Sequence, residues 1–181
     1  MRYAETVILK GGVELLVRNA VALDARALRD VMQRTHAETD YLLSYSDEQS
    51  GDDEQEARSL EETERSCNEV ELVAVVDGKI VGSAGVTAVG SRRKVLHRVR
   101  FGISVLQEYW GMGIGRVLMD ACIDCARRAG CTQLELEVVA NNERALSLYR
   151  RVGFEEYGRN PRGYLSASSG YQELVHMRLE L

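Results

Sequence analysis

The sequence lacks long apolar runs and contains a single proline. These absences limit the classes of protein to which it can belong. No hydrophobic stretch approaches the roughly 20 residues that a membrane-spanning helix needs, so we expect no membrane partner. Residues 1–12 do not have the layout of a signal peptide, which leads us to expect a cytoplasmic protein. The chain has 181 residues, no internal repeat and no interdomain linker, so we expect one domain over residues 1–181.

Cysteine and histidine, the residues that hold zinc in structural sites, are also sparse, with four cysteines and three histidines in the chain. Cys122 and Cys125 form a C-x-x-C pair, but they share helical spacing with apolar neighbours such as Leu118. Neither Cys67 nor Cys131 supplies a second pair, and no histidine cluster lies nearby. We therefore predict that the cysteines are small buried hydrophobic residues and that the chain has no metal site.

The net charge of −5 is concentrated in one segment. Residues 45–66 contain nine acidic residues and two arginines, so this segment carries −7 and the remainder about +2. Such a balance argues against a nucleic-acid partner. A run of charge is usually the solvated face of a loop or helix, and we expect that here.

Hydrophobic patterning predicts strands and helices along most of the chain. Strands are expected at 13–18, 70–76, 79–87, 95–105, 133–139, 154–157 and 172–181, and helices at 24–38, 54–66, 113–129 and 145–152. The order is an antiparallel half followed by a β-α-β crossover. It predicts a mixed α/β fold with a mostly antiparallel central sheet and helices on both faces.

Turn-forming residues divide these elements. Asp77-Gly78 between two apolar runs predicts a hairpin. Gly82 and Gly85 in its second arm predict a bulge or a close backbone approach. Residues 160–170 contain the only proline and are expected to form a loop.

A strand-to-helix junction within residues 97–115 is the most informative stretch. Glycines 111, 113 and 115 alternate there, so the backbone can approach a ligand and present free amides at a helix N-terminus. Such amides form an anion site. The last glycine is followed by Arg116 and Val117 rather than Lys-Ser/Thr, which argues against a nucleotide-triphosphatase loop. The spacing also departs from the G-x-G-x-x-G dinucleotide fingerprint.

Two motifs in this chain resemble those of the GNAT superfamily of N-acetyltransferases. The first, Trp110-Gly111-Met112-Gly113-Ile114-Gly115, is similar to its acetyl-CoA pyrophosphate loop, Gln/Arg-x-x-Gly-x-Gly/Ala, with Trp110 in place of Gln or Arg. The second, from Asn142 to Phe154, is similar to the signature N-x-x-A-x-x-L-Y-x-x-x-G-F. Their order and spacing also match, so the resemblance covers nearly the whole chain.

The resemblance implies acetyl-CoA as the acetyl donor and assigns roles to particular residues. The glycine-loop amides would hold the pyrophosphate, the pantetheine arm would lie beside a central strand that splays from its neighbour, and an amide near Val105 would polarise the thioester carbonyl. Asn142 would bind pantetheine, and Tyr149 would protonate the departing thiolate. The implied cofactor-binding residues are Ile103, Val105, Trp110, Gly111, Met112, Gly113, Ile114, Gly115, Asn142 and Tyr149.

Three of these assignments have plain structural alternatives. Tyr149 lies on an apolar helical face and could be a core residue. Asn142 could serve only as a helix N-cap, a role compatible with cofactor binding. Trp110 and Met112 could be hydrophobic cover.

The base that deprotonates the attacking amine is not evident from the sequence. Some members of the family carry a glutamate at about the position of Val99, where this chain has none. His97 lies two residues earlier on the same predicted strand face and is a candidate catalytic base. It could equally be a core residue, with a chain of water molecules moving the proton. Glu38 and Tyr41 lie in the region that caps the acceptor site in the family and are candidate substrate-binding residues.

These features favour an enzyme that moves acetyl from acetyl-CoA to a primary amine by direct attack in a ternary complex. The acidic segment favours a small cationic amine over a protein N-terminus as acceptor, because negative potential concentrates cations. The alternative is a noncatalytic acyl-CoA-binding sensor or scaffold. A homodimer is possible, since the resemblance includes pairing through the closing strands.

Overall fold

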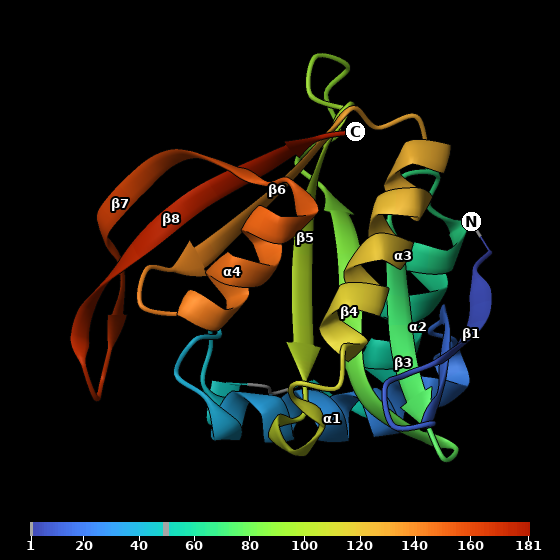
Figure 1. Cartoon of the computed structure of the whole chain (residues 1–181). Helices are drawn as coiled ribbons and strands as arrows, with labels where there is room; N and C mark the ends of the chain where they lie inside the picture. Colours follow the sequence, from blue (N-terminus) through green and yellow to red (C-terminus); the bar gives the residue numbers. More distant parts are fainter. Residues whose placement is uncertain (1, 49–50) are drawn as a thin grey trace.

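An eight-stranded sheet forms the centre of the molecule, which a computed structural model describes over residues 2–48 and 51–181 (Figure 1). The strand order is β1-β2-β3-β4-β5-β6-β8-β7. Neighbouring strands are antiparallel except for β5 and β6, which are parallel. The strands are β1 (Ala4–Ile8), β2 (Glu14–Asn19), β3 (Val70–Val76), β4 (Lys79–Ala88), β5 (Arg98–Val105), β6 (Gln133–Val139), β7 (Glu155–Ser166) and β8 (Gly170–Glu180). The predicted mixed, mostly antiparallel sheet is confirmed.

Helices cover both faces of this sheet, as predicted (Figure 1). The four are α1 (Ala25–Glu38), α2 (Asp53–Arg65), α3 (Ile114–Arg128) and α4 (Glu143–Val152). Helices α3 and α4 lie on one face, and α1 and α2 lie on the other. None of the helices within the described residues is long and apolar enough to cross a membrane.

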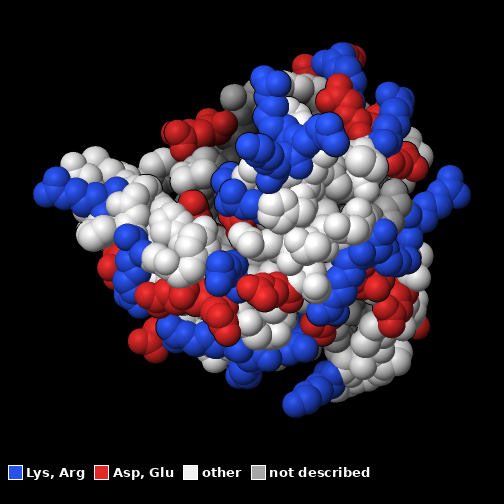
Figure 2. Space-filling view, turned by 90° about the horizontal axis from the view of Figure 1, so that it is seen from above, with Lys and Arg blue, Asp and Glu red and all other residues white. Residues whose placement is uncertain are grey.

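The acidic segment consists of a short 3-10 turn at Ser46–Glu48 and then the solvated helix α2, as expected for a loop followed by a helix, while residues 49–50 lie outside the described part. Helix α2 buries only Leu60, which joins Leu28 of α1 and Val73 of β3 in a small second core. Arg29 of α1 binds Asp53 at 2.5 Å, so α2 is attached to α1. Seen from above, the surface carries charges of both signs side by side (Figure 2).

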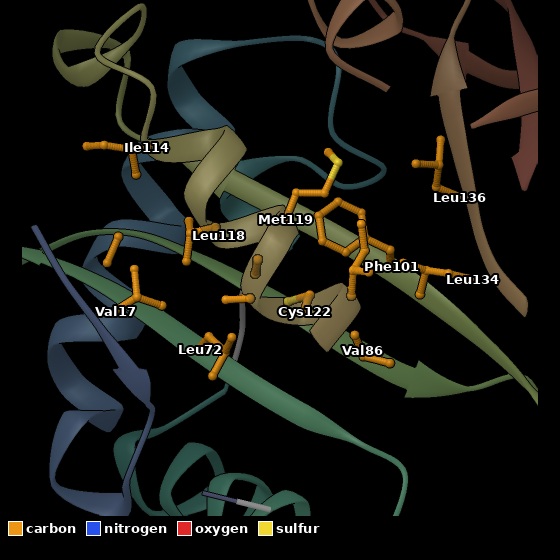
Figure 3. Close-up of a cluster of buried hydrophobic side chains, with 14 of the residues drawn as sticks. Val17, Leu72, Val86, Phe101, Ile114, Leu118, Met119, Cys122, Leu134 and Leu136 are labelled. Carbon is orange, nitrogen blue, oxygen red and sulfur yellow. The ribbon is translucent and has the colours of Figure 1, made fainter. Parts of the chain in front are cut away.

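The main core lies between the sheet and α3. Leu118 and Cys122 of α3 point at Leu72 of β3 and at Phe101 of β5, and all four are buried (Figure 3). The predicted burial of Cys122, like that of Cys125 and Cys131, is confirmed, whereas Cys67 is exposed.

The hairpin and its glycines are also confirmed. Asp77 and Gly78 both have positive φ, 49° and 73°, and they connect β3 to β4. The pairing shifts at Val75, which leaves a bulge in β4 next to Gly82. A Cβ on Gly82 would lie 2.7 Å from the carbonyl oxygen of Ser104, so the backbones of β4 and β5 approach closely.

The prediction of a loop at residues 160–170 is wrong. Strand β7 runs through Pro161 to Ser166 and pairs with β8, although the register shifts between Asn160 and Tyr164. The proline is tolerated because β7 is an edge strand with no neighbour on its outer side. The pattern also failed to predict β1, another edge strand, because its residues are mostly exposed and show no apolar alternation.

The start predicted for the central strand is also wrong. Strand β5 begins at Arg98, and His97 lies in the exposed turn before it. The alternation that included Val95 and His97 therefore extended the strand too far. Both residues lie in a turn in which Arg98 N–H donates to the Val95 carbonyl.

Replacing Gly82 with alanine should lower the free energy of unfolding by about 1–3 kcal/mol, because the added methyl group would collide with the Ser104 carbonyl. Gly102→Ala is the matched control, since a Cβ at this β5 position meets no atom within 4 Å. Urea unfolding of both variants measures the difference. Equal stability of the two variants would contradict the close approach of β4 to β5.

Candidate active site

A gap between β5 and β6 organises the site. The two strands pair only over Arg98–Arg100 and Gln133–Glu135, although β5 continues to Val105 and β6 to Val139. On their other sides, β5 stays paired with β4 and β6 with β8 along most of their length. The backbone groups that face the gap therefore have no strand partner there, and an extended ligand can supply one. The splay that the resemblance implies is present.

The glycine loop lies at the end of β5 and starts α3. Gly111 and Gly113 have φ of 82° and 97°, a conformation that favours glycine. Gly113 is the N-cap of α3, and no side chain caps the helix there. A Cβ on either glycine would meet nothing within 4 Å, so the space above the loop is open. The first amides of the helix are therefore available to an anion.

Trp110, which replaces the polar residue of the motif, ties this loop to β5. Its indole Nε1 donates to the Val105 carbonyl at 2.6 Å. The guanidinium of Arg144, in the first turn of α4, lies over the indole ring at 4.6 Å from its centre. Trp110 thus positions the positive charge of Arg144 beside the glycine loop, and its ring also covers the loop.

Helix α4 positions the other two predicted cofactor residues. Asn142 is its N-cap, and the side-chain oxygen accepts from the amide of Ala145 at 3.1 Å. Tyr149 is buried between Phe101 of β5 and Phe154, with ring centres 6.4 Å and 5.8 Å away. Burial raises the pKa of Tyr149 to about 12, so the phenol is protonated at neutral pH.

Ile103, also predicted to contact the cofactor, lies close to the start of α3. A Cβ on Gly115 would lie 3.7 Å from the Ile103 side chain and 3.6 Å from that of Leu148. The central strand, α3 and α4 therefore meet at this point beside the gap.

The two predicted acceptor-binding residues lie at the end of α1 and just after it. The Glu38 carboxylate accepts a hydrogen bond from the amide of Gln107 at 2.7 Å. Glu38 therefore connects the end of α1 to the segment that precedes the glycine loop. Tyr41 is exposed. Because the Glu38 carboxylate already has a backbone partner, a structural role accounts for it.

The segment that follows α1 is attached to the tip of the β7–β8 hairpin. The Asp40 carboxylate accepts from the hydroxyls of Ser166, Ser168 and Ser169 at 2.6–3.1 Å, which lowers its pKa. The amide of Ala167 donates to the Tyr45 hydroxyl at 2.7 Å. These contacts join α1 to β7 and β8 at one end of the sheet.

His97 is not brought to this site. It lies at the end of β5 opposite to the glycine loop, and a strand of this length spans roughly 25 Å. Its backbone carbonyl accepts from the amides of Thr132 and Gln133, and its side chain is exposed. The strand face that suggested His97 as a base does not exist at this position.

A cavity of about 320 Å³ lies where β5 and β6 part, on the sheet face opposite to α3 and α4. Its polar and aromatic lining consists of Arg98, Arg100, Glu135, Glu137, Tyr157 and His176. The face is fixed by Ser104, which shares its side of β5 with Arg100 and contacts Met32 of α1.

Two pairs of charged or titratable groups meet in this cavity. Arg98 binds the buried Glu135 through two hydrogen bonds, at 2.5 and 2.9 Å, and holds the pKa of Glu135 below its usual value. Glu137 lies 3.3 Å from Nδ1 of His176. The alternation of Glu135 and Glu137 with leucines was visible in the sequence, but their neighbours on β5 and β8 were not.

The family model described as Acetyltransferase (GNAT) family matches residues 31–154. The chain belongs to this family. A solved GNAT-family acetyltransferase from Streptococcus pneumoniae is 29% identical, with a TM-score of 0.89, over 92% of this chain and 99% of that one. Streptothricin acetyltransferase of Streptomyces lavendulae is 31% identical over 86% of this chain and 77% of its own length.

Relatives named for peptide or protein acceptors match over a shorter part. The N-alpha-acetyltransferase RimI of Mycobacterium tuberculosis is 38% identical over 52% of this chain and 58% of its own length. Several curated relatives are matched over only 23% to 58% of their length. A GNAT-fold structure from Salmonella typhimurium, 21% identical with a TM-score of 0.82, is described with its cofactor acetyl-CoA.

Acetyl-CoA is the donor typical of the GNAT family, and the residues present here fit it. The open amides of the glycine loop suit a pyrophosphate, and the unpaired edge of β5 suits an extended pantetheine arm. No group of three or more His, Cys, Asp or Glu residues within the described chain is arranged to hold a metal ion.

Replacing Gly113 with alanine should weaken acetyl-CoA binding about tenfold, because a residue with a Cβ is strained by about 1–2 kcal/mol at this φ and the loop would shift. Gly130→Ala is the matched control, since Gly130 has a φ of 78° just beyond the other end of α3. Both variants should lose similar stability. Calorimetric titration with acetyl-CoA measures the affinity of each variant. Equal affinities would contradict the binding of acetyl-CoA by the glycine-loop amides.

Proposed function

We propose that this GNAT-family chain transfers acetyl from acetyl-CoA to the primary amine of a small molecule, by direct attack in a ternary complex. The observation that carries the proposal is the gap beside β5, which has Tyr149 near one face of the sheet and a polar cavity on the other. A small-molecule acceptor is supported by the relative matched over most of this chain, which is named for streptothricin. Relatives named for protein acceptors match about half of it.

The donor half of the site consists of backbone and α4 residues. The amides from Trp110 to Gly115 bind the pyrophosphate, with Arg144 adding positive charge, and Asn142 binds pantetheine. Ile103 and Val105 line the gap, and an amide near Val105 polarises the acyl carbonyl. Bound acetyl-CoA supplies an acetyl group already activated as a thioester.

Two protein groups on opposite sides of the gap move protons. The amine nitrogen forms a bond to the acetyl carbon as the carbon–sulfur bond breaks. Glu137, supported by His176, accepts the proton that the amine loses. Tyr149 donates its phenolic proton to the departing sulfur, since a tyrosine phenol is protonated at neutral pH and burial raises its pKa further. Glu137 therefore takes the role for which His97 was a candidate.

The position of the acidic segment removes the main reason to expect a purely cationic acceptor. Helix α2 packs against α1 and β3, whereas the gap lies between β5 and β6. Its carboxylates therefore do not line the cavity where β5 and β6 part. The charge of the acceptor must therefore be inferred from the charged residues that line that cavity.

Tyr149→Phe should lower kcat about 10²–10⁴-fold and leave the Kd for acetyl-CoA unchanged, because the ring still packs while the proton donor is lost. Thiol release against a panel of amines measures kcat, and calorimetry measures Kd. Tyr171→Phe, at an exposed β8 position, is the control. Full turnover by the Tyr149 variant would rule out this role. Acetyl-CoA binding without release on any amine would favour a noncatalytic sensor.

Glu137→Gln should lower kcat/KM about 10²–10³-fold near neutral pH, since the amine then loses its proton acceptor. The deficit should shrink as the pH rises, because more of the free amine is already neutral. Glu155→Gln, at the exposed start of β7, is the control and should behave as wild type. A deficit that stays constant with pH would show that Glu137 acts in some way other than proton transfer.

A further inference from the structure

The cavity between β5 and β6 contains one positive and one negative group that do not neutralise each other. Arg98 and Glu135 are already joined by two hydrogen bonds. Among the residues that the structure describes, Glu137 forms an ion pair only with the imidazole of His176. Within residues 2–48 and 51–181, Arg100 makes no side-chain hydrogen bond or ion pair, although its charge helps to lower the pKa of Glu135. The remaining charges are therefore the Arg100 guanidinium and the Glu137 carboxylate.

Strand register places these two groups at the mouth of the gap. Arg100 is the last residue of β5 that pairs with β6, and its partner is Glu135. Glu137 lies two residues further along β6 on the same face. Paired strands are about 4.8 Å apart and advance about 3.3 Å per residue, so the Cα atoms of Arg100 and Glu137 are at least roughly 8 Å apart, because the strands begin to separate here. A small molecule there can contact both side chains.

We infer that the acceptor is an amino acid or a similar small molecule that carries a carboxylate beside its amine. The amine lies toward Glu137 and His176, and the Arg100 guanidinium binds the carboxylate. This inference rests on the proposed function, because it uses the same cavity as the acceptor site. Arg100 is then the residue that determines acceptor specificity.

Other amine classes match these charges less well. A diamine or polyamine would place a second cation near Arg98 and Arg100 and leave the Arg100 charge without a partner. A protein N-terminus has an amide where an amino acid has its α-carboxylate, so it offers Arg100 no negative charge. The charge left after internal pairing is thus complementary to a zwitterion.

The test compares free amino acids with their carboxamides and with the corresponding decarboxylated amines. The full chain should acetylate the amino acids with kcat/KM at least tenfold above the carboxamides. Arg100→Gln should lower kcat/KM on the amino acids about 10–100-fold, the usual loss for a charge-assisted hydrogen bond, and leave that on the carboxamides nearly unchanged. Arg100→Lys should keep part of the preference, because it keeps the charge but loses the bidentate geometry.

Arg93→Gln is the matched control, because it removes the same charge from the exposed turn before β5. It should leave the ratio of amino acid to carboxamide unchanged. A wild-type chain that acetylates both classes equally, or an Arg100 variant that loses activity equally on both, would overturn the inference while the transferase proposal stands.

A binding measurement separates the two proposals. Calorimetric titration of the CoA-bound chain with an amino acid, and then with its carboxamide, needs no turnover. Binding of the amino acid that Arg100→Gln abolishes would support the inference even if no acetyl is transferred, and the transferase proposal alone would fall. Equal binding of the two compounds, or no binding of either, would overturn the inference.

Discussion

The short parallel pairing between β5 and β6 is the constraint on which the site depends. Three residues on each strand are paired, with Arg98 bound to the buried Glu135 across them, and beyond that point the strands separate. A buried ion pair adds little net stability, because desolvation offsets its attraction, but loss of one partner is costly. Arg98 is about one third exposed, and its pair with Glu135 lies within the short paired region. The backbone groups beyond it are left for a ligand to satisfy.

The glycine loop shows how a motif can lose its polar side chain and keep its open backbone amides. Anion binding at a helix N-terminus depends on backbone amides, which Trp110 leaves in place. The indole adds an anchor to the Val105 carbonyl and a stacking surface for Arg144. A cation held by α4 thus lies close to the position at which the motif ordinarily has its own polar residue.

Local sequence signals predicted the parts of the fold that depend on local chemistry. Alternating glycines, a hairpin turn and helical apolar spacing were enough to place the glycine loop, β3–β4 and the helix of Tyr149, whereas the role expected of Tyr149 came from the motif resemblance. Edge strands β1 and β7 were missed or shortened because their residues are largely exposed and need no apolar pattern. His97 was placed on β5 because the alternation of apolar and polar residues begins before the true start of the strand.

The charged groups of the cavity show why local patterns do not suffice for a site. Glu137 meets His176 only because β6 pairs with β8, and that register is set by contacts across the whole sheet. The acidic segment, which dominates the net charge of the chain, packs on α1 and β3 instead. Charges that are already paired or lie elsewhere do not select a ligand. In the proposed acceptor site, selection rests with the charges that no oppositely charged arginine or carboxylate offsets, namely the Arg100 guanidinium and the Glu137 carboxylate beside His176.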